Sequence, residues 1–326
     1  MSFTGRLQYY RRIFGAYLTP GPSHLTFWHD VPQATPDAPC ERLGAYYMDF
    51  TQKADYPGYY DAWGIPKLDY RGHISLQYNP IAIAQWGLGN YNLHLRTKDE
   101  ERRRKFLNAA HWLCSNLERN PQGVWVWNHH FDWEYRDRLK APWYSGLAQG
   151  QGISLLLRVH KETGEPALAE AAERAFGAFL KSTQEGGVTF TDDHGDLWVE
   201  EYVVSPPTHI LNGFIWAAWG IHDYYLATGS SAARDLFAGA VRTLCTNLGQ
   251  YDAGFWSLYE CAGKPLPMLA SSFYHRLHIV QLRVMFRLSG ERLFADYADR
   301  WESYFGSHFN RLRALCYKGA FKLCYY

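Results

Sequence analysis

Three ionisable side chains, Glu200, Glu201 and Tyr202, stand in a row in "VEEYVVSPPTHILNGF". A proline pair and an apolar segment follow. Because proline is tolerated in the first turn of a helix, we expect the three groups on the loop that leads into one. Carboxylates and a phenol held there could transfer protons to and from a substrate. The simpler interpretation is a solvated turn, since glutamates are seldom buried.

A second group of reactive side chains lies in "SLYECAGKPLP" and "FYHRLHIVQL". Phenols, imidazoles and cations together could bind a substrate and exchange protons with it. A tyrosine at the start of a helix is more commonly a packing residue. The residues are Tyr259, Lys264, Tyr274, His275, Arg276 and His278.

Aromatic residues make up 17% of the chain, with 24 Tyr and 13 Trp. A large aromatic core accounts for most of them. The remainder indicates a carbohydrate-binding surface, because aromatic faces stack on the C–H groups of sugars. Trp127, Arg136 and Tyr144, in and just after the segment 121–143, are candidate substrate-binding residues.

No metal site and no cofactor are expected. The adjacent His129 and His130 point apart, which does not suit coordination of one metal. The glycine-rich "GLAQGQG" does not follow a strand, as a dinucleotide-binding loop would, and instead predicts close packing between helices. The G-x-S-x-G elbow of serine hydrolases does not occur in the sequence, and the six cysteines form no C-x-x-C pair.

The charge balance argues against nucleic-acid binding, since 33 basic and 32 acidic residues leave a net charge of +1. No apolar run reaches the roughly 18 residues of a membrane span. The first residues also lack the apolar stretch and cleavage site of a signal peptide. We therefore expect a cytoplasmic protein without a membrane span, and a homodimer is left open.

Four stretches share one plan, in which an apolar helix is followed by a short polar turn and a charged amphipathic helix. The turns stand at Thr97, Thr163, Thr228 and Ser289, between 61 and 66 residues apart. Such a period is typical of repeat architectures. Gly164, Gly229 and Gly290 suit the C-terminal cap of a helix, and Pro166 suits a first helical turn.

Helices that are apolar nearly all round are buried, whereas helices with one apolar stripe lie outside them. The repeats therefore predict an all-α fold, an incomplete α/α toroid of about four hairpins over residues 75–304. Short β-hairpin connections at 121–143, 186–206 and 250–272 would gather at one end, the mouth. Two domains are expected, an irregular N-terminal extension of residues 1–75 that wraps the outside or the mouth, and the toroid of residues 76–326.

Several segments resemble one known family. "QYNPIAIAQWGLGNY", "WYSGLAQGQGISLLLR", "EEYVVSPPTHILNGF", "YDAGFWSLYE" and "FYHRLHIVQL" are similar to the C-terminal catalytic domain of D-glucuronyl C5-epimerase, the isomerase that converts glucuronate to iduronate in heparan sulfate precursors such as heparosan. The resemblance covers residues 75–304. It implies an incomplete α/α barrel that acts on a uronate-containing oligo- or polysaccharide.

The resemblance also implies site residues. Three tyrosines, an acidic residue and an asparagine of the family's active site fall on matching positions. They are Tyr202, Tyr259, Tyr274, Glu201 and Asn212. The family carries an arginine shortly after the second tyrosine, where this chain has Lys264 as a possible substitute cation.

The implied reaction removes the C5 hydrogen, which lies α to a carboxylate, so negative charge develops on the carboxylate oxygens. Hydrogen-bond donors and cations would stabilise that charge, and the candidates are Asn212, His275, Arg276, His278 and Lys264. Inversion also needs a base on one face and an acid on the other. We expect Glu201 or Tyr202 on one face and Tyr274 on the other, with Tyr259 positioning the ring. Glu201 is expected to be ionised without help, whereas a phenol needs a nearby cation to act as a base.

Three other functions stay open. A uronate polysaccharide lyase begins with the same proton removal but expels the O4 substituent. An inverting glycoside hydrolase needs two carboxylates, which Asp132 or Glu134 could supply with Glu201. A sugar-binding module with an inactive site is the third.

Overall fold

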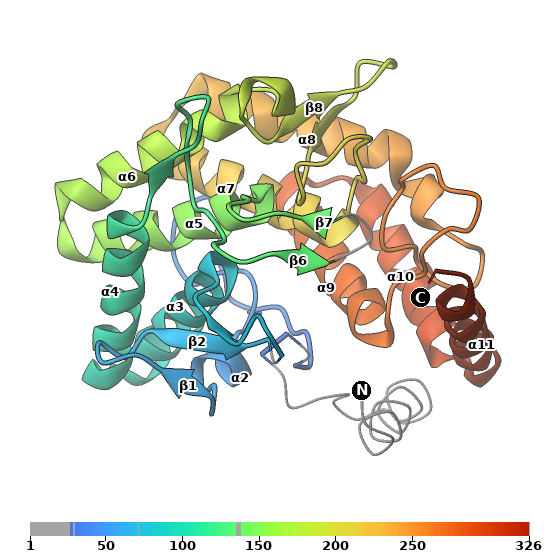
Figure 1. Cartoon of the computed structure of the whole chain (residues 1–326), viewed down its shortest axis with the longest axis horizontal. Helices are drawn as coiled ribbons and strands as arrows, with labels where there is room; N and C mark the ends of the chain where they lie inside the picture. Colours follow the sequence, from blue (N-terminus) through green and yellow to red (C-terminus); the bar gives the residue numbers. More distant parts are fainter. Residues whose placement is uncertain (1–26, 29, 71, 135–137, 326) are drawn as a thin grey trace. The chain divides into compact units, whose positions relative to one another are not determined.

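The computed structural model describes residues 27–28, 30–70, 72–134 and 138–325, and helices dominate it (Figure 1). The chain divides into two compact units. The larger unit comprises residues 35–243, and the smaller comprises residues 244–326 with the described part of 1–34.

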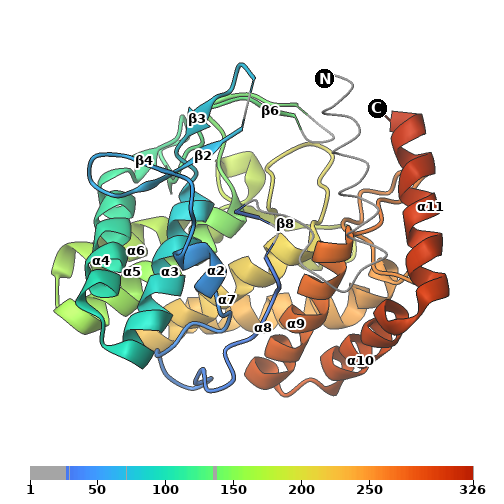
Figure 2. The ribbon, with the colours of Figure 1, turned by 90° about the horizontal axis from the view of Figure 1, so that it is seen from below.

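Three helical hairpins that follow one another begin in the larger unit. They are α3 (Pro80–Thr97) with α4 (Glu100–Ser115), α5 (Gly146–Thr163) with α6 (Pro166–Phe176), and α7 (Leu211–Thr228) with α8 (Ser231–Asn247). The first helix of each pair is buried over most of its length, whereas α4 and α6 bury one stripe. Helix α5 packs against both α3 and α7, so these three are the inner helices (Figure 2).

Glycines set both the turns and the packing of these helices. Gly164 and Gly229 end α5 and α7 in the left-handed conformation, as the sequence predicted, and Pro166 begins α6. Within the helices, a Cβ on Gly220 would lie 2.3 Å from the Cα of Gly150. Helices α5 and α7 therefore meet backbone to backbone, which only glycine permits.

Part of the N-terminal extension belongs to the core of the larger unit. Tyr46, Tyr47 and Phe50 are buried, and the rings of Tyr46 and Tyr47 contact Trp219 of α7. The side chain of Asn92 on α3 holds the same segment, because it accepts from the Tyr46 N–H and donates to the carbonyls of Tyr46 and Met48. The short helix α2 (Thr51–Ala54) then lies against α3 (Figure 2). These residues pack against the inner helices and do not wrap around them.

Short antiparallel strands fill the connections. Strands β1 (Tyr59–Tyr60), β2 (Pro66–Asp69) and β3 (Leu76–Gln77) form one sheet. Three hairpins follow, β4 (Glu118–Arg119) with β5 (Trp125–Val126), β6 (Trp133–Glu134) with β7 (Arg138–Leu139), and β8 (Thr189–Thr191) with β9 (Leu197–Val199). Short 3-10 helices stand at Gly177–Leu180, Thr183–Glu185 and Leu248–Tyr251.

The smaller unit contains a fourth hairpin, α9 (Ser272–Ser289) with α10 (Arg292–Gly306), and a further helix, α11 (His308–Tyr325). Gly290 ends α9 in the left-handed conformation, as predicted. Trp256 and Leu269 of the preceding connection share a core cluster with Ala314 and Leu315 of α11.

The predicted fold class, an all-α incomplete α/α toroid with short β-hairpin connections, is confirmed by the four hairpins and by the alternation of inner and outer helices in the larger unit. In the described part of the chain, no helix combines the length and the apolar character needed to cross a membrane.

Candidate active site

The loop that carries Glu200, Glu201 and Tyr202 is fixed at its beginning by backbone hydrogen bonds. It leaves β9 at Val199 and runs past the N-terminus of α5, where the Gly146 N–H donates to the Glu200 carbonyl at 3.0 Å. A Cβ at Gly146 would lie 2.6 Å from that carbonyl oxygen. Glycine at the start of α5 is thus what lets the loop come so close.

Glu200 is fully buried and hydrogen-bonded, which corrects the simpler interpretation of a solvated turn. Its carboxylate lies 2.6 Å from His209 Nδ1 and also accepts the N–H groups of Thr208 and His209. The imidazole is stacked on Trp198 at 4.1 Å. Glu200 therefore ties the loop to the segment that enters α7. No pattern in the sequence predicted His209 as its partner.

Glu201 is buried as well, but its polar partners are neutral. Its carboxyl rests on Gly213 in the first turn of α7, where a Cβ would lie 2.2 Å from Oε2. Asn212 Nδ2 donates to the same oxygen at 3.2 Å. Burial raises the pKa of Glu201 to about 8, and hydrogen bonds from Asn212 and Tyr202 only partly oppose that rise.

The expectation that Glu201 is ionised without help is therefore wrong. Removing a carboxylate from water disfavours its charged form unless a cation or several donors replace the solvent. With a pKa of about 8, Glu201 carries its proton at neutral pH and can exchange it near that pH. This is the state expected of a group that works as acid and as base in turn.

Tyr202 is half-buried beside an aromatic cluster. Its ring lies edge-on to Trp143 at 5.7 Å, and Trp143 is stacked on His129 at 3.7 Å. Phe131 and Leu139 complete the cluster. Packing on one side thus orients the phenol, while its hydroxyl hydrogen-bonds to Glu201.

The other candidates of the larger unit differ in access. Trp127 is fully buried, its indole N–H donates to the Leu113 carbonyl at 2.8 Å, and its ring covers Gly152. It offers no face for stacking on a sugar. Tyr144 is half-buried, and burial raises the pKa of its phenol. Arg136 lies outside the described residues.

In the smaller unit, Tyr259 and Tyr274 lie together. Their rings meet edge to face, with centroids 4.8 Å apart. Tyr274 is in the first turn of α9, where its N–H donates to the capping Ser271 hydroxyl. Tyr259 is held by a hydrogen bond from its N–H to the Met268 carbonyl.

His275 is a buried neutral imidazole. Its Nδ1 accepts the Ser257 N–H at 3.1 Å, and its Nε2 faces the Trp301 carbonyl at 3.0 Å, so Nε2 carries the hydrogen. Its ring is stacked on Trp256, and burial lowers its pKa to about 3. It therefore holds the connection to α9 and is not a cation for a substrate carboxylate.

The Ser257 hydroxyl links this imidazole to that of His278. The sequence did not predict this link. The hydroxyl lies 2.8 Å from His275 Nδ1 and 3.0 Å from His278 Nδ1. Because His275 Nδ1 has no hydrogen, the hydroxyl donates to it and accepts from His278. Burial holds the pKa of His278 well below its usual value, so both imidazoles are neutral.

Two cationic candidates remain in the smaller unit. Arg276 is half-buried, with its guanidinium 5.3 Å from the centre of the Phe305 ring, and burial lowers its pKa. Lys264 is exposed on the loop between Cys261 and Pro267. Both can reach an anionic ligand more readily than the buried imidazoles can.

Asp132, a candidate for hydrolase chemistry, serves the β6–β7 hairpin. It accepts the Ala141 N–H and pairs with Arg138, each at 3.0 Å, and these contacts lower its pKa. Glu134 is exposed in β6. Within the described ranges, no group of three or more His, Cys, Asp or Glu side chains is arranged to hold a metal ion.

Comparison with known proteins identifies the family. The model of the family described as "D-glucuronyl C5-epimerase C-terminus" matches residues 119–303. A D-glucuronyl C5-epimerase of Caenorhabditis elegans is 29% identical over 221 residues, covering 63% of this chain and 35% of that protein. An uncharacterized protein of Methanocaldococcus jannaschii is 27% identical over 179 residues, covering 54% of this chain and 56% of that one. The chain thus spans about a third of the first relative and about half of the second.

Two solved structures show a low similarity to this chain. The unsaturated glucuronyl hydrolase from Bacillus sp. GL1 has a TM-score of 0.47 and 17% identity, covering 69% of this chain and 61% of its own. The cellobiose 2-epimerase from Spirochaeta thermophila has a TM-score of 0.46 and 15% identity, covering 76% and 63%. Similarities this low carry no argument about activity.

The family match includes both groups of candidate residues, from Glu201, Tyr202 and Asn212 to Tyr259, Tyr274 and His278. The family is one of carbohydrate-processing enzymes. Since its model covers more than half of the sequence, this protein belongs to the D-glucuronyl C5-epimerase C-terminal family.

Proposed function

We propose that this protein is a carbohydrate epimerase that inverts C5 of D-glucuronate residues in a glycan to give L-iduronate. A base removes the C5 proton, the electron pair is delocalised into the neighbouring carboxylate, and an acid returns a proton to the opposite face. No glycosidic bond breaks, and no electrons are exchanged with a redox partner.

The observation that carries the proposal is the state of Glu201. A buried carboxyl on the first turn of α7, with a pKa of about 8, can both give and take a proton near neutral pH. Asn212 and Tyr202 orient it through hydrogen bonds. We assign Glu201 to one face of the sugar, as acid in one direction and as base in the other.

The opposite face is assigned to Tyr274, with Tyr259 positioning the sugar ring. The edge-to-face contact of these two rings restricts the orientation of the Tyr274 phenol. Arg276 and Lys264 are the proposed contacts for the substrate carboxylate, because an accessible cation can stabilise the charge that develops there. The buried imidazoles of His275 and His278 are assigned to holding α9 and its preceding connection.

The test is hydrogen exchange in deuterated water with a glucuronate-containing polysaccharide such as heparosan. An epimerase places deuterium at C5 and leaves the chain length unchanged, which NMR and size-exclusion chromatography measure together. A lyase would accumulate an unsaturated uronate that absorbs in the ultraviolet, and a hydrolase would release reducing ends. Chain cleavage at the rate of deuterium uptake would overturn the proposal.

A variant tests the role of Tyr274. Tyr274→Phe removes only the hydroxyl, so its melting temperature should stay close to that of the unmodified protein, while deuterium uptake falls by about a hundredfold or more. A well-folded Phe variant with full uptake would make Tyr274 a packing residue. His275→Ala should behave in the opposite way, with a large loss of stability, because that imidazole is fully buried.

A further inference from the structure

A groove of about 660 Å³ lies on the larger unit, away from the Glu201 loop. One wall is the segment from the end of α2 to the turn after β1, and the other is helix α4. Its volume lies in the range usual for small-molecule sites. The groove is lined by Ala54, Asp55, Tyr56, Tyr60, Asp61, Ala62, Trp63, Gly64, Arg104, Lys105 and Asn108.

Hydrogen bonds hold the backbone of Trp63 in place, whereas its side chain faces solvent. Asp61 Oδ1 accepts the N–H groups of Trp63 and Ile65, and Asn108 Nδ2 on α4 donates to the Trp63 carbonyl at 2.9 Å. The indole is nevertheless 77% exposed. A large aromatic side chain that is open to water at the edge of a groove can stack on a ligand.

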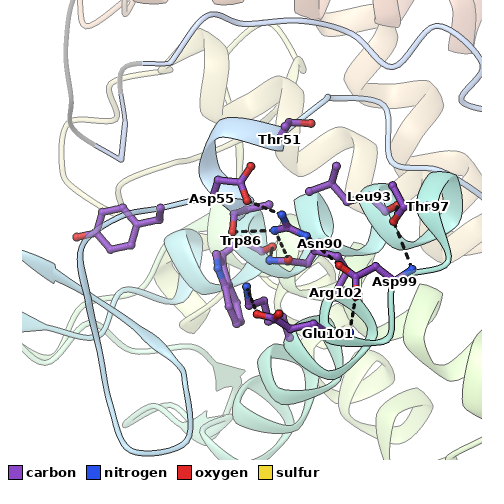
Figure 3. A network of polar contacts seen from close by, with 12 residues as sticks. Thr51, Asp55, Trp86, Asn90, Leu93, Thr97, Asp99, Glu101 and Arg102 are labelled. Carbon is purple, nitrogen blue, oxygen red and sulfur yellow. Dashed lines mark hydrogen bonds and ion pairs between the residues drawn. The ribbon is translucent and has the colours of Figure 1, made fainter.

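The acidic side chains of the groove are already engaged. Asp55 pairs with Arg102 at 2.6 Å, and Arg102 also donates to Asn90, as Figure 3 shows. The second oxygen of Asp61 accepts the Tyr78 hydroxyl at 2.8 Å. Asp55 thus has a cationic partner that does not line the groove, and both oxygens of Asp61 are engaged by neutral donors.

The cations of the groove stand on α4. Lys105 shares its charge with Glu101 at 2.8 Å, one turn away. Arg104 is exposed and makes no ion pair with any described residue. The groove thus combines an open aromatic face with a guanidinium that can bind a carboxylate through two hydrogen bonds.

From this combination we infer that the groove binds an acidic sugar unit of a glycan. The apolar face of the sugar lies on Trp63, and its carboxylate is bound by Arg104 with help from Lys105. A neutral sugar would lose the contact with Arg104. A carboxylate without a sugar ring would lose the contact with Trp63. The inference goes beyond the proposed function, since it concerns a binding site that includes none of the catalytic candidates.

The test uses a glucuronate-containing oligosaccharide and the same oligosaccharide with its carboxyl groups reduced to alcohols. Tryptophan indole N–H signals are followed by NMR, and the Trp63 signal is assigned by its loss in Trp63→Ala. We expect the acidic oligosaccharide to shift this signal, with a saturable dependence on concentration, and the reduced one to leave it unmoved. The indole signal reports this groove even if the glycan also binds elsewhere.

Variants sharpen the test. Arg104→Gln should weaken the binding reported by the Trp63 signal about tenfold, the scale of one hydrogen bond to a charged group. Arg103→Gln is the matched control, as a neighbouring arginine of α4 outside the groove, and should leave the affinity unchanged. Tyr59→Ala removes an exposed ring that does not line the groove, so it should keep the Trp63 signal and leave the affinity unchanged.

The outcomes separate this inference from the proposed function. C5 exchange with no shift of the Trp63 signal would overturn the groove and leave the epimerase. A saturable shift that depends on Arg104, without C5 exchange, would support the groove and refute the epimerase. A shift equal for the acidic and reduced oligosaccharides would refute the role of Arg104 and with it the inference.

Discussion

Two buried carboxyl groups lie at opposite ends of α7 and have opposite surroundings. Near the C-terminal end, Asp223 forms an ion pair with Arg158 of α5 and accepts the Tyr47 hydroxyl at 2.8 Å. At the first turn, Glu201 rests on Gly213 with only an amide and a phenol as polar partners. Both carboxyl groups are shielded from water, but of the two only Asp223 has a cationic side chain as its partner.

The difference shows how one helix can serve the fold at one end and chemistry at the other. At the Asp223 end, burial alone would lower the pKa of Arg158, but the attraction and hydrogen bonds of the Asp223 carboxylate together outweigh burial and raise the pKa of the guanidinium, which therefore stays charged. The pair joins α5 to α7 and holds the segment that carries Tyr46 and Tyr47, over whose rings the guanidinium lies. At the Glu201 end, the missing cation lets the carboxyl keep its proton.

Breaking the ion pair should have the largest effect on the protein. Asp223→Asn leaves the buried Arg158 guanidinium without a counter-charge, which typically costs about 3–5 kcal/mol of unfolding free energy. Urea denaturation of the variant measures it. The double variant Arg158→Met with Asp223→Leu should recover much of the loss, since no charge remains buried. If the unfolding free energy of Asp223→Asn lies within about 1 kcal/mol of that of the unmodified protein, the ion pair does not stabilise the fold as expected.

Neutralising Glu201 should affect activity and spare stability. Glu201→Gln keeps the shape of the side chain but cannot exchange a proton, so C5 deuterium uptake should fall by about a hundredfold or more. Its unfolding free energy at neutral pH should be unchanged or higher. The neighbouring Glu200→Gln is the control, because it weakens the contact with His209 and should lose about 1–3 kcal/mol of stability. The reverse pattern would show that the roles of the two glutamates are exchanged.

The raised pKa of Glu201 predicts how stability depends on pH. Between its ordinary value of 4.5 and its folded value of about 8, the unfolded chain has released this proton and the folded chain keeps it. Each pH unit in that window therefore lowers the unfolding free energy by up to about 1.4 kcal/mol through this group. The unfolding free energy of the unmodified protein should therefore fall relative to that of Glu201→Gln from pH 5 to pH 8, so that the variant becomes the more stable of the two. A difference constant over that range would mean that Glu201 is ionised in the fold.

Gly213→Ala should have the smallest effect. The new Cβ would stand 2.2 Å from Glu201 Oε2, so the carboxyl must move, while alanine gains about 1 kcal/mol of helix propensity. We expect about a tenfold loss of deuterium uptake with little change in melting temperature, since small displacements of a catalytic group are costly. Gly177→Ala is the control, because open space surrounds Gly177. Equal uptake by both variants would show that the position of Glu201 is not critical.

Much of the fold could be predicted from the sequence. The left-handed caps at Gly164, Gly229 and Gly290 and the start of α6 at Pro166 were found where the sequence indicated them. The predicted hairpin connection at 186–206 contains β8 and β9, whereas the one at 250–272 makes only isolated bridges. Helix α11 was not predicted.

The site was predicted less completely. The sequence put Tyr259 and Tyr274 in one candidate group, and the structure shows their rings in contact. It did not reveal that Trp127 and His275 are enclosed in the core. One usable signal was overlooked, because Arg158 and Asp223 are charged residues within apolar helices, and such residues need a buried partner. The assigned roles of the site residues stay predictions until the variants are measured.

The sequence by itself determined the helical hairpins, their turns and the buried character of α3, α5 and α7. Helix periodicity, caps and glycine turns depend on residues a few positions apart, so a linear pattern contains them. The tertiary structure alone decided that Glu200 is paired, that Glu201 keeps its proton and that Trp63 is open to solvent. Burial and pKa depend on which distant side chains replace water around a group, and folding brings those side chains together from elements far apart in the chain.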